Sequence, residues 1–371
     1  MAEAPFIFMV AGEESGDQAA AQVVSALKDR WPEARILAVG GARMREAGAE
    51  ILFDSSELAV MGFAEVVAHL PRLLRRRRQA RRFLKKQAPD LFIPVDAPGF
   101  NIPLCREARR RGVPVLYYVA PQVWAWGAGR LKAMRRDLTA LALILPFEED
   151  WFRARGIEAR FVGHPLAGRY EACAADREPT RIGLMPGSRA QELSRHLPVM
   201  LEAASLLRAE RPELRFSVLE TEAISTSIYS GYIDQFEGDV KLFRGDGAGF
   251  FGGQDLLWAC SGTATLEAAL AGLPMVVLYR TGFLSYQLAR RLVKLDRIAL
   301  VNLVAERGIV PELIQGEAEP ARLADAMRRL LDDGQARGAQ REAFAEIREK
   351  LGSLKPGAEV AEMAGRILES P

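Results

Sequence analysis

Small polar residues, a glycine and an acid gather in one stretch whose spacing could bind an anionic ligand. The stretch is Ser261-Gly262-Thr263-Ala264-Thr265-Leu266-Glu267. Residues 255–260 are mostly apolar and predict a buried strand, and residues 263–271 predict a helix that Gly272 ends. Free N–H groups at such a helix start favour an anion. A diphosphate there, with ribose hydroxyls on Glu267, would fit a nucleotide. Alternatively, Ser261 or Thr263 only caps the helix and Glu267 supports the cap.

Two other turns carry charged residues after apolar segments. Asp96 follows residues 90–95, and an acid at the carboxyl end of a parallel strand faces the ligand crevice. Partial burial there would raise its pKa toward that of a general base, although Asp96 could instead cap the following turn. Arg189 ends the turn Pro186-Gly187-Ser188-Arg189, just before a predicted helix at residues 191–209. A guanidinium beside a helix N-terminus is suited to a diphosphate.

The chain begins with a third unit of this kind. Residues 6–11 are apolar, and the turn Gly12-Glu13-Glu14-Ser15-Gly16-Asp17 leads into a predicted helix at residues 18–29. This turn has neither the dinucleotide-binding nor the P-loop spacing. Ser15 and Asp17 could cap the helix, whereas Glu13 has no evident structural role.

The repeated succession of strand, small-residue turn and helix predicts an α/β protein with parallel sheets. A length of 371 residues is too great for one ordinary core and indicates two domains. We place the first at residues 1–170 and the second at residues 181–350, with a polar linker at residues 167–180.

Three local predictions complete this outline. Residues 221–254 look irregular, and Gly245-Asp246-Gly247-Ala248-Gly249 is predicted to be a flexible loop. The helix after Asp96 is expected at residues 103–111. Pro311 is expected to begin a helix.

Composition narrows the functional class. The chain is 49% hydrophobic and 26% charged with a net charge of +2, so nothing global suggests nucleic acid. Cys105, Cys173 and Cys260 are far apart, which indicates buried thiols in a reducing compartment, and the scattered cysteines and histidines predict no metal site. No apolar run approaches the roughly 18 residues of a membrane span, and no secretory signal is expected. We therefore expect a cytosolic protein.

Residues 72–86 contain nine basic residues and no acids. They could form a solvated helix face or a landing site for anionic lipid headgroups beside exposed apolar side chains. A nucleic-acid interface is less favoured, because no aromatic residues alternate with the charges. The candidate membrane residues are Met61, Phe63, Arg72, Arg75, Arg76, Arg77, Arg78, Arg81 and Arg82.

Motifs between residues 10 and 315 resemble, in the same order, those of the lipid-A-disaccharide synthase family. In the first half they are Ala11-Gly12-Glu13 with Ser15-Gly16-Asp17, Leu58-Ala59-Val60-Met61-Gly62-Phe63, Val95-Asp96-Ala97-Pro98 with Phe100-Asn101, Val123-Trp124-Ala125-Trp126 and Leu145-Pro146-Phe147-Glu148. They continue with Phe161-Val162-Gly163-His164-Pro165, Pro186-Gly187-Ser188-Arg189, residues 261–267, Asn302-Leu303 and Pro311-Glu312-Leu313-Ile314-Gln315.

The resemblance implies a GT-B fold, with two facing Rossmann-like, doubly wound domains, an interdomain cleft and a C-terminal helix at residues 351–371 that returns to the first domain. It implies inverting transfer of 2,3-diacylglucosamine from UDP to 2,3-diacylglucosamine 1-phosphate, giving a β-1,6 disaccharide and UDP. Neither a metal nor a cofactor is required. The family is peripheral to the membrane, so the resemblance implies a location on the cytosolic face of the inner membrane and permits a homodimer.

By the same resemblance, individual residues acquire roles. Asp96 would be the general base. The UDP-donor site would comprise Ser188, Arg189, Ser261, Gly262, Thr263, Thr265, Glu267, Asn302 and Gln315. The cleft and acceptor side would comprise Glu13, Ser15, Gly16, Asp17, Asn101 and Trp124.

The chain departs from the family pattern at Gly99, Ala120, Gln122, Gly127 and Val301. Most of these positions lie on the acceptor side, so acyl-chain length and acceptor identity stay open. Two other functions also stay open. One is another GT-B enzyme acting on UDP-N-acetylglucosamine, either an epimerase or a transferase with a soluble acceptor. The other is a non-catalytic relative that binds nucleotide or lipid.

Overall fold

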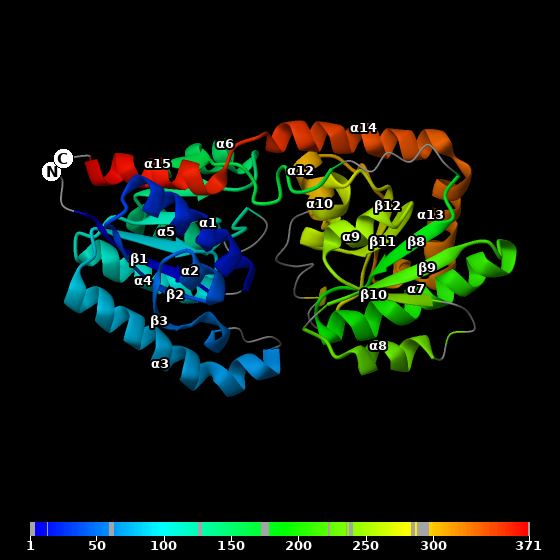
Figure 1. Ribbon diagram of the computed structural model, residues 1–371, viewed down its shortest axis with the longest axis horizontal. Helices are drawn as coiled ribbons and strands as arrows, with labels where there is room; N and C mark the ends of the chain where they lie inside the picture. Colours follow the sequence, from blue (N-terminus) through cyan, green and yellow to red (C-terminus); the bar gives the residue numbers. More distant parts are fainter. Residues whose placement is uncertain are drawn as a thin grey trace. The chain divides into compact units, whose positions relative to one another are not determined.

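The computed structural model describes residues 4–12, 14–58, 63–124, 128–171, 178–221, 223–234, 236, 240–282, 286–287 and 297–369. The chain divides into two compact units (Figure 1). The first comprises Met1–Pro165 and Ser353–Pro371, and the second comprises Leu166–Gly352. Within the described ranges, no helix has the length and apolar character needed to cross a bilayer.

A parallel sheet forms the centre of the first unit, and its described strands follow the order β3-β2-β1-β4-β5-β6-β7. The strands are β1 (Phe6–Ala11), β2 (Arg35–Gly40), β3 (Glu50–Asp54), β4 (Leu91–Val95), β5 (Leu116–Tyr118), β6 (Ala140–Leu143) and β7 (Ala159–Phe161). Along β1, Ile7 and Met9 face one side of the sheet, Phe8 and Val10 face the other, and all four are buried. Both faces must therefore be covered by helices.

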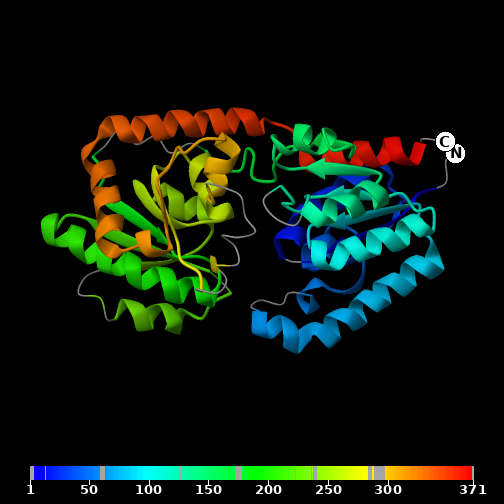
Figure 2. The ribbon, with the colours of Figure 1, turned by 180° about the vertical axis from the view of Figure 1, so that it is seen from behind.

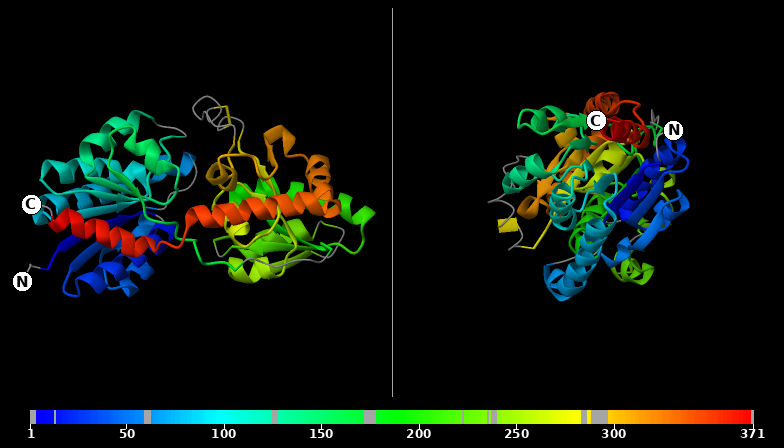
Figure 3. Two further views of the ribbon diagram at one scale, coloured as in Figure 1. Left: turned by 90° about the horizontal axis from the view of Figure 1, so that it is seen from above. Right: turned by 90° about the vertical axis from the view of Figure 1, so that its left-hand side faces the viewer.

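Helices cover the two faces of this sheet. Residues of α1 (Glu14–Arg30) and α15 (Pro356–Glu369) pack with Ile7 and Met9, and the two helices lie side by side (Figure 3). Gly357 permits this approach, because a Cβ there would lie 2.4 Å from the Gln22 carbonyl oxygen. The opposite face is covered by α3 (Phe63–Gln87), α4 (Pro98–Arg110) and α5 (Leu131–Asp137), seen together in Figure 2. The other α-helices described in this unit are α2 (Ala42–Glu46) and α6 (Glu148–Arg153).

The second unit repeats the plan, with described parallel strands in the order β10-β9-β8-β11-β12-β13. The strands are β8 (Arg181–Met185), β9 (Arg215–Glu220), β10 (Val240–Arg244), β11 (Leu256–Cys260), β12 (Met275–Tyr279) and β13 (Glu312–Ile314). The described helices are α7 (Ala190–Glu210), α8 (Thr226–Ile233), α9 (Gly247–Gly252), α10 (Thr263–Leu270), α12 (Leu300–Ala305), α13 (Pro320–Asp332) and α14 (Gly334–Leu351).

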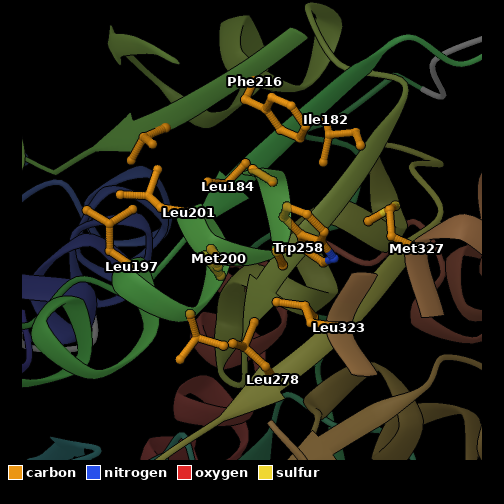
Figure 4. Close-up of a cluster of buried hydrophobic side chains, with 14 of the residues drawn as sticks. Ile182, Leu184, Leu197, Met200, Leu201, Phe216, Trp258, Leu278, Leu323 and Met327 are labelled. Carbon is orange, nitrogen blue, oxygen red and sulfur yellow. The ribbon is translucent and has the colours of Figure 1, made fainter. Parts of the chain in front are cut away.

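A buried cluster on one face of this sheet centres on Trp258, which lies among side chains from α7 and α13 (Figure 4). Met200 reaches it from α7, and Leu323 and Met327 reach it from α13. These helices therefore close one face of the sheet, and the turns that follow β8 and β11 are attached to a rigid core. The two doubly wound α/β domains expected from the sequence are confirmed.

Three local predictions are wrong. Residues 245–249 do not form a free loop. Gly245 and Asp246 connect β10 to α9, and residues 247–249 are the first turn of α9, which Asp246 caps by accepting a hydrogen bond from the Gly249 amide at 2.8 Å. The region between 221 and 254 also contains α8. Pro311 precedes strand β13 rather than a helix. The helix after Asp96 begins at Pro98, whose fixed φ suits a first helical turn.

Candidate functional site

A pocket of about 340 Å³ opens in the second unit where the strand order reverses. β8 and β11 are neighbours, but the chain leaves them toward opposite edges of the sheet, so their following loops diverge and leave a crevice. The lining residues come mainly from the turns after these two strands: Met185, Pro186, Gly187, Ser188, Arg189, Glu192, Leu219, Thr221, Cys260, Ser261, Gly262, Thr263, Ala264 and Glu267. Two of the turns that the sequence singled out therefore meet in one pocket.

The start of α10 presents backbone groups to this pocket. Gly262 is the N-cap residue with φ 155°, and no side chain caps the helix there. The Ser261 hydroxyl instead donates to the Ile298 carbonyl oxygen at 2.9 Å. The interpretation of Ser261 or Thr263 as a simple cap is therefore wrong. Because Thr263 and Ala264 line the pocket, the first amides of α10 are placed to bind an anion.

The turn before α7 is organised by Glu192, which sequence reasoning missed. Its carboxylate accepts a hydrogen bond from the Ser188 amide at 3.2 Å and pairs with Arg189 at 3.3 Å. Gly187 has φ 111°, and a Cβ there would lie 2.6 Å from a Glu192 carboxylate oxygen. A glutamate three residues after the N-cap was the available signal. Because the Arg189 side chain is 54% exposed, its ion pair is weak and the guanidinium can turn to an incoming anion.

His196 is a buried side chain of α7 that supports the turn after β8 from within the protein. Its Nε2 accepts a hydrogen bond from the Arg280 amide at 2.8 Å, so Nδ1 carries the proton and donates to the Pro186 carbonyl oxygen at 2.8 Å. Burial lowers the pKa of His196, which is consistent with a neutral ring. This residue ties the turn after β8 to the end of β12.

Glu267 lies half-buried at the pocket wall, one helical turn after Thr263. Burial raises the pKa of Glu267, and the Tyr170 hydroxyl donates a hydrogen bond to it at 2.9 Å. The Tyr170 ring packs edge-on against Phe251, and its carbonyl oxygen accepts a hydrogen bond from Arg348. Tyr170 belongs to the stretch that we took for a linker, so the sequence offered no sign of this pairing.

Three expected donor-site residues do not line the pocket. Thr265 is fully buried, and its hydroxyl donates to the Gly262 carbonyl oxygen at 2.8 Å. Asn302 is 1% exposed, and its amide is held by the Ile309 and Val310 backbone and by Glu312.

Gln315 is the third of these residues. Its side chain exchanges two hydrogen bonds with the Thr281 backbone. All three side chains therefore support the surrounding loops, and their expected contacts with the donor stay predictions.

In the first unit, Asp96 follows β4 at the corresponding reversal of strand order, between β1 and β4. Asp96 and Ala97 have φ values of 47° and 46°, a conformation that costs a non-glycine residue about 1 kcal/mol or more. The Asp96 carbonyl oxygen accepts hydrogen bonds from Asn101 Nδ2 at 2.8 Å and from the Tyr117 hydroxyl at 2.6 Å. Gly12, after β1, lies so close that a Cβ would be 2.3 Å from that of Ala97. The N-cap residue of α4 is Ala97, one position after Asp96.

Two residues expected to line the cleft are internal. Asn101 is fully buried, and its amide donates to the Val10, Val95 and Asp96 carbonyl oxygens, so it supports the Asp96 turn. Asp17 is 4% exposed and accepts hydrogen bonds from the Gly41, Arg43 and Met44 amides at the start of α2. Asn101 Nδ2 and the Asp17 carboxylate are therefore engaged by the surrounding backbone, and the expected contacts of these two residues with an acceptor stay predictions.

Three further residues were expected in the cleft. Ser15 is exposed, whereas Gly16 is buried. Glu13 lies outside the described residues.

Trp124 is anchored to the end of the sheet by Glu148. Its indole N–H donates to the Glu148 carboxyl at 2.8 Å, and its ring meets Phe147 edge-on at 5.1 Å between centroids. Glu148 is 1% exposed, and burial raises its pKa to about 8. Glu148 ends the motif Leu145-Pro146-Phe147-Glu148, whose residue types alone indicate no partner for its carboxyl group.

The arginines of α3 that were expected at a membrane fall into two groups, those held in ion pairs and those that are not. Arg72 and Arg76 both pair with Glu57, and Arg81 pairs with Glu107. Arg75, Arg78 and Arg82 are exposed, and Arg77 is half-buried. Met61 and the side chain of Phe63 lie outside the described residues. Among the residues described, no three His, Cys, Asp or Glu side chains form a group that could hold a metal ion.

We predict that Glu148 makes stability fall as pH rises. Its folded pKa of about 8 exceeds the ordinary value of 4.5, so the folded state binds more protons between these pH values. The free energy of unfolding should decrease through this window, by on the order of 5 kcal/mol at most. Glu148→Gln keeps an acceptor for Trp124 and should remove the loss.

The measurement is the thermal unfolding midpoint between pH 5 and pH 8.5. The exposed Glu158 supplies the control variant Glu158→Gln, which should follow the wild type. Parallel pH profiles for wild type and Glu148→Gln would contradict the prediction.

Comparisons with known proteins agree over nearly the whole chain. The family model described as Lipid-A-disaccharide synthetase matches residues 7–361. The lipid-A-disaccharide synthase of Anaeromyxobacter dehalogenans is 42% identical over 362 residues, which cover 95% of this chain and 94% of the relative. That of Myxococcus xanthus is 38% identical over 381 residues, covering 99% of each chain.

Solved structures with little sequence identity share the fold. The glycosyltransferase of kitacinnamycin has a TM-score of 0.66 at 17% identity, covering 98% of this chain and 99% of its own. The calicheamicin glycosyltransferase has a TM-score of 0.61 at 17% identity with full coverage of both chains. The UDP-GlcNAc 2-epimerase of Neisseria meningitidis has a TM-score of 0.60 at 11% identity, covering 97% and 98%. These likenesses concern the GT-B fold alone, whereas the sequence matches identify the chain as a member of the lipid-A-disaccharide synthetase family.

Proposed function

We propose that this chain condenses UDP-2,3-diacylglucosamine with 2,3-diacylglucosamine 1-phosphate in lipid A biosynthesis. Membership of the family makes it a hexosyltransferase of lipid A disaccharide synthesis. In the proposed step the acceptor 6-hydroxyl attacks the donor anomeric carbon, a β-1,6 bond forms, and the bond to the diphosphate breaks. The hydroxyl proton passes to a base, the anomeric centre inverts, and UDP leaves. The observation that carries this proposal is the anion pocket at the β8–β11 reversal.

We assign the donor to this pocket of the second unit. The first amides of α10 would bind the diphosphate together with Arg189 and Ser188, and these groups would stabilise the charge that develops on departing UDP. Ser261, Gly262 and Thr263 form the wall that the diphosphate would contact. Glu267, oriented by Tyr170, would accept hydrogen bonds from ribose hydroxyls.

We assign the general base to Asp96. Its position at the carboxyl end of β4, beside the reversal of strand order, is where a doubly wound domain binds ligands. The strained backbone at Asp96 and Ala97 is held by Asn101 and Tyr117, which would orient the carboxylate toward the acceptor hydroxyl. Ser15 and Trp124 are proposed to contact the acceptor. The reaction as proposed needs neither a metal nor a cofactor.

An epimerase is the second candidate within the same fold, because the epimerase of Neisseria meningitidis shares it. The sequence relationship favours the transferase, since the relatives at about 40% identity bear the synthase name. Mass spectrometry of the products from UDP-diacylglucosamine with and without diacylglucosamine 1-phosphate separates the two. A disaccharide that forms only when both substrates are present supports the transferase. An epimerised UDP-sugar that forms without the acceptor would contradict the transferase and support the epimerase.

Replacement of the base should separate chemistry from binding. Asp96→Asn keeps the shape of the side chain but removes its proton acceptor, so turnover should fall about 100-fold or more. The UDP affinity of the variant, measured by calorimetry, should stay within twofold of that of the wild type. This retained binding also shows that the variant is folded. Full activity of Asp96→Asn would refute the assignment.

Glu267 should confer discrimination between UDP and its 2′,3′-dideoxy analogue. A charged hydrogen bond contributes about 1.5–3 kcal/mol, so the wild type should bind UDP at least about tenfold more tightly than the analogue. Glu267→Ala should lose most of this preference. Titrations belong near pH 8, because burial raises the pKa of Glu267 and its protonated form is a poorer acceptor.

Tyr170→Phe is the companion variant in these titrations. It keeps the Glu267 carboxylate but removes the hydrogen bond that orients it. The preference of Tyr170→Phe for UDP should therefore lie between those of the wild type and Glu267→Ala. If Glu267→Ala kept the full preference for UDP over the dideoxy analogue, the assignment of Glu267 to the ribose hydroxyls would be refuted.

We also propose that α3 docks the chain on the cytosolic face of the inner membrane. Arg75, Arg78 and Arg82 are exposed on this helix and have no ion pair among the described residues. Such side chains attract anionic lipid headgroups by about 1 kcal/mol each near the surface. A homodimer, which the family resemblance permits, stays a prediction.

Vesicle sedimentation tests this docking. Arg75→Gln/Arg78→Gln should lower binding to anionic phospholipid vesicles several-fold, and salt should weaken wild-type binding because exposed charges are screened. Arg43→Gln/Arg45→Gln removes two exposed arginines from α2 and is the matched control. Equal loss in both double variants would show that net charge, rather than α3, determines the association.

A further inference from the structure

A second concave surface lies in the first unit, away from β4 and Asp96. It has a volume of about 380 Å³ and is lined by residues of α3, α4 and α5, most of which lie outside the buried cluster that packs on the sheet. Figure 2 shows the three helices along one face of this unit. We call it the arginine groove, because five arginines line it: Arg77, Arg81, Arg106, Arg110 and Arg136.

The two acids of the groove are already neutralised. Glu107 is 4% exposed and accepts a hydrogen bond from Arg81 at 2.8 Å, and Lys85 and Arg111 lie within 3.9 Å of its carboxylate. Burial favours the neutral acid, but these cations lower the pKa of Glu107 below its ordinary value. Asp137 is paired with Arg136 at 2.6 Å. Neither carboxylate is therefore left to oppose an anion.

Three cations of the groove stay uncompensated. Within the described part of the chain, Arg77, Arg106 and Arg110 form no ion pair. Arg106 and Arg110 are four residues apart on α4, where like charges on one helix face destabilise each other. Arg77 approaches the same space from α3. The groove therefore carries an excess of positive charge, and a bound anion would reduce the repulsion among these arginines.

The chemistry of the groove favours phosphate. Guanidinium groups bind phosphate oxygens through paired N–H donors, and several from different helices can surround one tetrahedral group. The other lining residues include Ile102, Pro103 and Leu104, and none of the lining residues is aromatic. Bases of a nucleic acid would have no stacking partner there. The concavity is also small, whereas a nucleic-acid backbone requires an extended basic stripe.

We propose that the arginine groove is a phosphate-binding site, separate from the donor pocket, that takes the phosphate of a glycerophosphate ester. The ester could be an anionic phospholipid headgroup in a bilayer or a soluble glycerol phosphate. The lipid form rests on the membrane association proposed above, whereas the soluble form does not.

The test uses the full chain with saturating UDP, so that the donor pocket is occupied. Arg106→Gln/Arg110→Gln removes two uncompensated cations from the groove. Arg109→Gln/Arg135→Gln removes two exposed arginines from the same helices outside it and is the matched control. The probes are phosphatidylglycerol vesicles in a phosphatidylcholine background, and glycerol 3-phosphate followed by phosphorus NMR.

For the lipid source, the groove variant should bind vesicles about tenfold or more weakly than the wild type, and the control should stay within twofold to threefold. For the soluble source, glycerol 3-phosphate should bind the wild type and the control but not the groove variant. The proposal is overturned if the two double variants bind vesicles equally and the wild type does not bind glycerol 3-phosphate. Vesicle binding would then reflect only a diffuse attraction between the arginines and the anionic surface.

Folding and the donor pocket are checked independently. UDP affinity should be the same in both double variants and the wild type, because the donor pocket is separate from the groove. A wild type that does not bind UDP would contradict the donor assignment without bearing on the groove. The thermal midpoint of the groove variant should equal or exceed that of the wild type, because two like charges have been removed. A lower midpoint together with unchanged probe binding would assign these arginines to stability and overturn the site.

Discussion

The reversal of strand order in each parallel sheet is the constraint on which the rest of the molecule depends. In the first unit it lies between β1 and β4, and in the second between β8 and β11. Strands on either side of the reversal send their connections in opposite directions, so the space above their carboxyl ends stays open. Asp96 follows one of these strands, and Arg189 and the start of α10 follow two others. The same geometry brings Gly12 against Ala97, where only a hydrogen fits.

In the second unit the proposed anion site is built largely from backbone groups, which must be held still to be effective. His196 and Glu192 hold the turn after β8, and Thr265 and Asn302 hold the start of α10 and the loop beside it. These side chains are buried or turned inward, and their hydrogen bonds are satisfied within the protein. Such an arrangement is already organised for a negative charge before the charge arrives.

Local patterns predicted most of the strands and helices, because an apolar strand, a small-residue turn and a helix each have a signature within about ten residues. Predictions became wrong where the pattern was short or polar. Residues 245–249 looked like a loop, yet Asp246 caps a helix there. Pro311 suggested a helix start, but the segment pairs with β12 and extends the sheet. Pairing with a distant strand leaves little trace in a three-residue segment.

The sequence by itself determined the fold class, the family and the turns that carry the candidate site, because all of these depend on residue types at fixed spacing. Only the tertiary structure decided which polar side chains face a ligand. Asn101, Asp17 and Asn302 belong to the family motifs, yet each is held by hydrogen bonds to the backbone, which for Asn101 and Asp17 include groups far along the chain. Tyr170 reaches Glu267 across 97 residues. A side chain's partners depend on contacts that close only when the sheet and its helices are assembled, so spacing along the chain cannot specify them.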